Sequence, residues 1–152
     1  MSITFTNLSN GNEIGSNSYL LQLGATRIVL DAGMHPKREG LDSVPDFDLI
    51  PPGELDAIFV SHAHLDHTGT LPVLMRKQPG ARVFMTEATR MLTDALLHNS
   101  VNVMSAKREE LDIPDYPFYT HFDLDDVFPA WEVSNVGRPF YFSSPDDVTC
   151  EL

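Results

Sequence analysis

Three of the six histidines in the chain fall within six positions of one another, in the stretch FVSHAHLDHTGTLP at residues 59–72. His62, His64, Asp66 and His67 form the pattern H-x-H-x-D-H. Neutral imidazole and carboxylate suit zinc and similar divalent metals. In an extended segment His62 and His64 point the same way and can share one ion, while the next pair can reach a second ion. Two such ions, roughly 3.5–4 Å apart, activate water for hydrolysis.

Regular elements are predicted on both sides of this cluster. Residues 55–61 (LDAIFVS) are nearly all apolar, which is typical of a strand buried on both faces. Residues 69–77 (GTLPVLMRK) predict a helix with Pro72 in its first turn. We therefore expect the cluster to lie in a loop that is held at both ends.

A β-hairpin is predicted upstream of the cluster. The apolar runs at residues 18–23 and 26–30 are separated by a Gly-Ala pair, which indicates a tight turn. The second run ends at Asp31, two residues before a turn glycine. Residues 34–54 carry four prolines and predict a loop with at most a short helical turn.

Downstream of the cluster the pattern alternates between strand and helix. We expect a strand at residues 81–86 and a helix at 87–99, with Met91 as core filling and His98 at the helix end. The order is a β-hairpin, a long loop, then β-loop-α-β-α, which indicates an α/β chain.

The last third of the chain is polar and acidic at first, then strand-like. Within residues 107–129 the run DLDDV can open a helix with Asp123 as its N-cap. Residues 140–142 and 148–152 predict two short strands.

Bulk composition limits the class of protein. With 152 residues, 42% of them hydrophobic, the chain is long enough for one domain with a buried core. No apolar run is long enough to span a bilayer, and no secretory signal is visible at the N-terminus. A single cysteine, Cys150, excludes a disulfide within the chain and is typical of a reducing compartment. We therefore predict a cytoplasmic protein that does not bind a membrane.

The formal net charge is −12. This charge counts against a broad nucleic-acid groove built from these residues alone, because such grooves are usually basic. It does not exclude a nuclease, because bound metal ions supply positive charge locally. Excess acid also aids solubility in proteins of any function.

The H-x-H-x-D-H cluster resembles the second motif of the metallo-β-lactamase fold, and the surrounding chain resembles the N-terminal half of that αββα fold, a mixed β-sheet with flanking helices. The stretch SHAHLDHTGTLP is similar to the β-CASP branch of RNA-processing nucleases. Residues 82–89 (RVFMTEAT) and 119–127 (YTHFDLDDV) resemble the same branch. The likeness covers most of the chain, although only the H-x-H-x-D-H motif is highly specific.

The resemblance implies a role for each matched residue. Asp31 matches the first motif of the family, an aspartate that orients a metal-binding histidine. His62 and His64 would bind one zinc ion, and Asp66 and His67 the other, giving two ions in a complete site. Asp66 would also orient or deprotonate the attacking water. The resemblance implies RNA as the substrate. Whether the protein forms a homo-oligomer is left open.

Four residues cannot complete two zinc sites. The family takes a further histidine, a bridging aspartate and another histidine from later motifs, none of which has a match here. We therefore interpret residues 1–152 as the N-terminal part of a metallo-β-lactamase domain, with the remainder of the domain and any β-CASP cap absent. The isolated chain is predicted to be inactive.

Two other functions stay open. The first is a hydrolase of a small-molecule ester, thioester or lactam, which the acidic charge favours slightly. The second is a non-catalytic fragment that acts as a binding module. The intact H-x-H-x-D-H motif argues against a non-catalytic role of the whole protein, but not of the isolated fragment.

The remaining polar residues receive structural interpretations. We expect His35 to be a solvated loop residue and His98 and His121 to be structural. Turn chemistry accounts for Asn17, and core packing accounts for Cys150.

Overall fold

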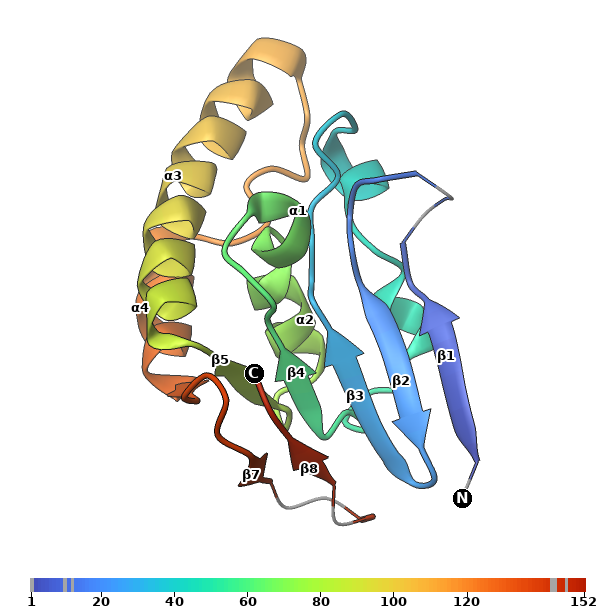
Figure 1. Cartoon of the computed structure of the whole chain (residues 1–152). Coiled ribbons are helices and arrows are strands. Elements are labelled where there is room, and N and C mark those ends of the chain that lie inside the picture. Colours follow the sequence, from blue (N-terminus) through green and yellow to red (C-terminus); the bar gives the residue numbers. More distant parts are fainter. Residues whose placement is uncertain (1, 10, 12, 143–144, 147) are drawn as a thin grey trace.

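Figure 1 shows a twisted β-sheet with helices against one face and a short strand pair against the other. The structure is a computed structural model that describes residues 2–9, 11, 13–142, 145–146 and 148–152. Within these ranges one sheet has six strands in the order β1-β2-β3-β4-β5-β6. Their bounds are Ile3–Asn7, Tyr19–Leu23, Thr26–Leu30, Ala57–Phe59, Arg82–Met85 and Trp131–Val133.

The sheet is mixed, as predicted. β1, β2 and β3 are antiparallel, whereas β3, β4, β5 and β6 pair in parallel. The predicted hairpin is confirmed, with Tyr19 opposite Leu30 and Gly24 in the turn at a φ of 63°. Parallel strands place their carboxyl ends at one edge of the sheet, where ligand sites of open α/β sheets lie. Asp31 follows β3 and the H-x-H-x-D-H cluster follows β4 at this edge.

Four α-helices lie in the described part of the chain. They are α1 Leu65–Thr68, α2 Leu71–Lys77, α3 Glu87–Leu111 and α4 His121–Val127. The helix predicted after the cluster is confirmed as α2, with Pro72 in its first turn. The proline-rich segment 34–54 contains two single-turn 3₁₀ helices, Gly40–Ser43 and Phe47–Leu49, and a third, Phe128–Ala130, follows α4.

Strand β4 is buried on both faces, as its sequence predicted. Ile58 packs into the larger core cluster, which the helices cover. Ala57 and Phe59 point to the opposite face and pack with Phe84 and Phe142 in a second cluster. The second face is covered by an antiparallel strand pair, β7 Phe140–Tyr141 and β8 Thr149–Cys150.

Several sequence-based expectations were wrong. α3 has 25 residues and continues well past residue 99, so His98 lies inside the helix rather than at its end. Its buried positions include Thr93 and Ser100, and these polar residues interrupt the apolar periodicity that the prediction relied on. Met91 is 55% exposed and is therefore not core filling.

The N-cap of α4 is Thr120, not Asp123. Asp123 stands at the third helical position, where its side chain accepts from the backbone N–H of Thr120 and completes a capping box. Strands β1 and β6 were not predicted. No helix among the described residues is both long and apolar enough to cross a membrane.

Candidate metal centre

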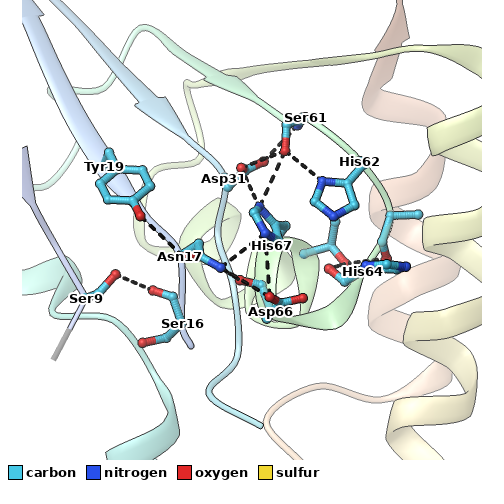
Figure 2. Close-up of polar contacts among 12 residues, drawn as sticks. Ser9, Ser16, Asn17, Tyr19, Asp31, Ser61, His62, His64, Asp66 and His67 are labelled. Carbon is cyan, nitrogen blue, oxygen red and sulfur yellow. Dashed lines mark hydrogen bonds and ion pairs between the residues drawn. The ribbon is translucent and has the colours of Figure 1, made fainter. Parts of the chain in front are cut away.

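Asp31 lies at the carboxyl end of β3 in a left-handed conformation, with a φ of 62°. Aspartate is one of the few residues besides glycine that tolerates this region. Its backbone N–H donates to the carbonyl oxygen of Phe59 over 2.8 Å, which fixes the residue against the end of β4. The side chain therefore faces the loop that carries the histidines (Figure 2).

Asp31 is 6% exposed, and its carboxylate accepts three hydrogen bonds. Ser61 donates to it twice, from its backbone N–H and from its hydroxyl, each over 2.7 Å. His67 donates from Nδ1, also over 2.7 Å. Because a carboxylate only accepts, the proton on His67 lies at Nδ1, and the lone pair at Nε2 faces away from Asp31.

His62 is oriented through the same serine. Ser61 has one hydroxyl hydrogen, which it donates to Asp31, so toward His62 its Oγ accepts. The His62 Nδ1–Ser61 Oγ distance is 3.1 Å, which places the proton of His62 at Nδ1 and its lone pair at Nε2. One buried carboxylate therefore sets the available nitrogen of two histidines.

The three histidine rings of the cluster gather at one point in Figure 2. The ring centroids of His62 and His67 are 4.1 Å apart, and those of His62 and His64 are 4.8 Å apart. His64 has the extended backbone that was expected and is the N-cap of α1. The expectation that the whole cluster lies in a loop was wrong, because Asp66 and His67 belong to α1. All five sequence-predicted site residues are nevertheless brought together: Asp31, His62, His64, Asp66 and His67.

Asp66 and His67 have a spacing suited to one shared ion. Asp66 Oδ2 and His67 Nε2 are 3.5 Å apart. Two ligands of a tetrahedral zinc ion lie about 3.4 Å apart, given zinc–ligand bonds of about 2.0–2.1 Å. Across the described residues, no three His, Cys, Asp or Glu side chains are arranged to hold one metal ion. Asp66 and His67 therefore fit a metal ion as a pair that needs further ligands.

The backbone beneath the site is tightly connected. Ala32 and Met34 donate to the carbonyl oxygens of His67 and Leu65, each over 2.8 Å. Gly33 lies between them, where a Cβ atom would stand 1.8 Å from the carbonyl oxygen of Asp66. Only glycine permits this close approach of the Asp31 turn to α1.

Two residues that contact the candidate ligands, Ser61 and Asn17, were not predicted from the sequence. The Asn17 side-chain nitrogen lies 3.2 Å from Asp66 Oδ2 and 3.1 Å from His67 Nε2. A signal for Asn17 was present in the predicted hairpin, because a two-residue turn places the start of its first strand beside the end of its second. Residue 17 was thus bound to lie next to Asp31.

A cavity of about 610 Å³ opens beside His64 and Asp66, between the segment after β3 and helix α3. Lys107 reaches it from α3 and is paired with Glu39 over 2.5 Å. Burial raises the pKa of Glu39, but hydrogen bonds from Lys107 and Tyr116 outweigh it and hold that pKa below its usual value. His35 also lines the cavity and is 5% exposed, so the prediction of a solvated histidine was wrong.

More than half of the chain matches a known protein family. Residues 11–100 match the family described as the Metallo-beta-lactamase superfamily. The chain belongs to the metallo-beta-lactamase superfamily. The matched segment contains all five site residues as well as Asn17 and Ser61.

Curated relatives confirm the resemblance to RNA-processing nucleases. Endoribonuclease YSH1 of Candida glabrata and Cleavage and polyadenylation specificity factor 73 of Drosophila melanogaster are each 36% identical over 129 residues. Endoribonuclease YSH1 of Saccharomyces cerevisiae is 35% identical over 131 residues. The alignments cover 84% of this chain but only 17%, 18% and 17% of these relatives, respectively. The chain thus spans less than a fifth of their length.

Solved structures support the fold assignment. An archaeal metallo-beta-lactamase superfamily protein from Sulfolobus tokodaii superposes with a TM-score of 0.51 at 17% identity, over 90% of this chain and 50% of that one. The metallo-beta-lactamase fold protein YhfI from Bacillus subtilis also gives 0.51, at 15% identity, over 92% and 49%. The predicted α/β class and mixed sheet are therefore confirmed.

Proposed function

We propose that this chain is the metal-binding N-terminal part of an endoribonuclease that hydrolyses phosphodiester bonds in RNA. The observation that carries the proposal is the orientation of His62 and His67 by Asp31, which places the proton of each ring at Nδ1 and its lone pair at Nε2. His67 Nε2 lies 3.5 Å from the Asp66 carboxylate. The relatives that are named endoribonucleases support the choice of reaction.

In this proposal His62 and His64 hold one zinc ion, and Asp66 and His67 hold the second. The ions supply positive charge that acidifies a water molecule and stabilises the charge that develops at phosphorus. Each pair needs further ligands, which we assign to residues beyond this chain, in agreement with the small share of the relatives that it covers.

The residues of this chain have distinct tasks. Asp31 keeps the proton of His67 at Nδ1, so that Nε2 stays a lone-pair donor throughout the reaction. Asp66 receives the Asn17 amide at Oδ2, and we assign Oδ1 to accept the proton of the attacking water. The side chain of Asp66 is 27% exposed, so water reaches it.

The test is cleavage of a single-stranded RNA by the full-length protein, compared with His64→Ala and with His98→Ala as a histidine control outside the site. We expect His64→Ala to lower the cleavage rate at least about 100-fold, since even residues that only orient a ligand are worth 10–100-fold. Zinc content, measured on the same samples, should fall from two ions toward one. His98→Ala should match the wild type in both measurements.

Assays with a thioester and a β-lactam distinguish the alternative that the net charge of −12 favours. Hydrolysis of either compound with RNA left intact would replace the nuclease with a small-molecule hydrolase. Two bound zinc ions without any hydrolysis would favour a binding module. Zinc content that is unchanged in His64→Ala would contradict the ligand assignment.

Three further sequence-based expectations stay predictions. These are the identity and number of the metal ions, a cytoplasmic location and a homo-oligomeric state.

A further inference from the structure

The side chain of Asn17 lies beside the two residues proposed to share an ion and contacts both (Figure 2). Its Nδ2 is 3.1 Å from the backbone oxygen of Asp66, 3.2 Å from Asp66 Oδ2 and 3.1 Å from His67 Nε2. These three groups are all acceptors, since His67 carries its proton at Nδ1. The amide nitrogen has two hydrogens, so it can donate to only two of these three acceptors at a time.

Tyr19 sets the orientation of this amide. Its hydroxyl donates to Asn17 Oδ1 over 3.2 Å. The opposite orientation would place Oδ1 against the Asp66 carboxylate, acceptor against acceptor, and would leave the Tyr19 hydroxyl facing an N–H donor. The hydrogen bonds thus run from Tyr19 through Asn17 to Asp66 and His67.

We infer that Asn17 is a positioning residue that holds the Asp66 carboxylate and the His67 ring at the spacing needed for one shared cation. This inference rests on the proposed function, because it concerns the same metal pair. Without the amide, two electron-rich groups 3.5 Å apart would face each other across the site. The amide donates to both and so keeps them close before any ion binds.

Asn17 donates to the same His67 Nε2 lone pair that an ion would take, and the third acceptor lets the amide give up this bond without losing a partner. When the ion takes the lone pair of His67 Nε2, both amide hydrogens still have partners, the backbone oxygen of Asp66 and Asp66 Oδ2. Ion binding therefore leaves no donor of the Asn17 amide unsatisfied.

Residue 17 holds the neighbouring segments together through its backbone. The N–H of Asn17 donates to the carbonyl oxygen of Asp66 over 2.9 Å, and its own carbonyl oxygen accepts from Gly33 over 3.0 Å. A side-chain substitution keeps both bonds. The loop and the positioning effect can therefore be separated by experiment.

The experiment measures zinc affinity by chelator competition, and the absorption spectrum with cobalt(II), on the full-length protein and Asn17→Leu. Leucine has the same branching at Cγ and no donor. We expect one of the two ions to bind about 10–100-fold more weakly and the other to bind as before. Only the cobalt bands of the weakened site should change. Tyr19→Phe should cause a smaller loss at the same site, because it frees the amide to turn.

Asn7→Ala is the matched control, because the Asn7 side chain, at the end of β1, hydrogen-bonds only to Ser9 and Gly11 among the contacts described. Unchanged affinities in Asn17→Leu would overturn the inference. Equal weakening of both ions with a lower melting temperature would also overturn it, since it would indicate a purely structural role. A wild type that binds two ions without cleaving RNA would refute the proposed function but leave the zinc comparison valid.

Discussion

Single residues with little freedom determine the shape of the candidate site. Gly33 is the sharpest example, because an added Cβ would lie 1.8 Å from the Asp66 carbonyl oxygen and 2.7 Å from the Asn17 nitrogen. Both neighbours are backbone atoms, so they cannot turn aside as a flexible side chain would. The three segments that meet here carry Asn17, Asp31 and Asp66.

We expect Gly33→Ala to lower the free energy of unfolding by about 3 kcal/mol or more, because it forces packed backbone segments apart. Urea denaturation followed by circular dichroism measures this change. Gly80→Ala is the control, since a Cβ at Gly80 meets nothing within 4 Å and should change stability little. Equal effects at the two positions would contradict the close-approach argument.

At the residue scale, spacing in the sequence predicted the histidines and their aspartate as site residues. It did not predict Asn17 or Ser61. The H-x-H-x-D-H pattern is local, so residue types alone reveal it. Asn17 reaches Asp66 from 49 positions away, and only the pairing of β2 with β3 brings it there.

Among the elements, α3 and α4 form the outer part of the helical layer. His98 on α3 and His121 on α4 contact each other, with 2.7 Å between their Nδ1 atoms and a ring-centroid distance of 5.0 Å. The structural role predicted for these two histidines thus takes the form of a contact between the helices. Asn102 accepts from His121 Nε2 over 3.1 Å and adds to the same contact.

The capping box of α4 provides a prediction at this scale. Thr120→Ala removes the side-chain oxygen that accepts from the Asp123 N–H, and we expect it to cost about 1 kcal/mol of stability near neutral pH. Thermal denaturation of the variant and the wild type measures the difference.

The same pair predicts a pH dependence. Hydrogen bonds from the backbone and the side chain of Thr120 hold the pKa of Asp123 below its usual value. A carboxylate with a lowered pKa stabilises the fold above its unfolded pKa, near 3.9, and this contribution is lost as the pH falls through the folded pKa. The stability gap between wild type and Thr120→Ala should therefore shrink below about pH 4. Asp126→Asn, on the exposed side of α4, is the control. When it is added to both proteins, the stability difference between wild type and Thr120→Ala should keep the same pH dependence.

At the scale of the whole molecule, the sheet separates two apolar clusters. The larger one lies under the helices, and the smaller one lies between the sheet and the β7–β8 pair (Figure 1). Phe59 is central to the smaller cluster, stacked on Phe84 with 5.2 Å between ring centroids and edge-on to Phe142 at 5.8 Å.

We expect Phe59→Ala to lower the free energy of unfolding by about 3–5 kcal/mol, as is usual when a buried phenylalanine is removed. The cavity would lie directly under β7 and β8, so this strand pair should exchange its amide hydrogens faster than the helices do. Phe122→Ala is the control because Phe122 is 82% exposed. Equal losses in the two variants would contradict the assignment of Phe59 to a second core.

The sequence by itself determined the local features of this protein. The H-x-H-x-D-H pattern, the β2–β3 hairpin, the doubly buried β4 and helix α2 all follow from neighbouring residues, because spacing, turn chemistry and apolar runs act over a few positions. The family resemblance rests on the same short motif.

Only the tertiary structure decided how those features meet. The length of α3 escaped prediction because its buried face includes threonine and serine, and the burial of His35 depends on the contact of its ring with Gly15. The tautomers of His62 and His67 are set by Asp31 from 31 and 36 positions away, and the proposed role of Asn17 depends on Tyr19 and α1 together. Such contacts join residues far apart in the chain, and strand pairing and packing rather than local propensity bring them within hydrogen-bond distance.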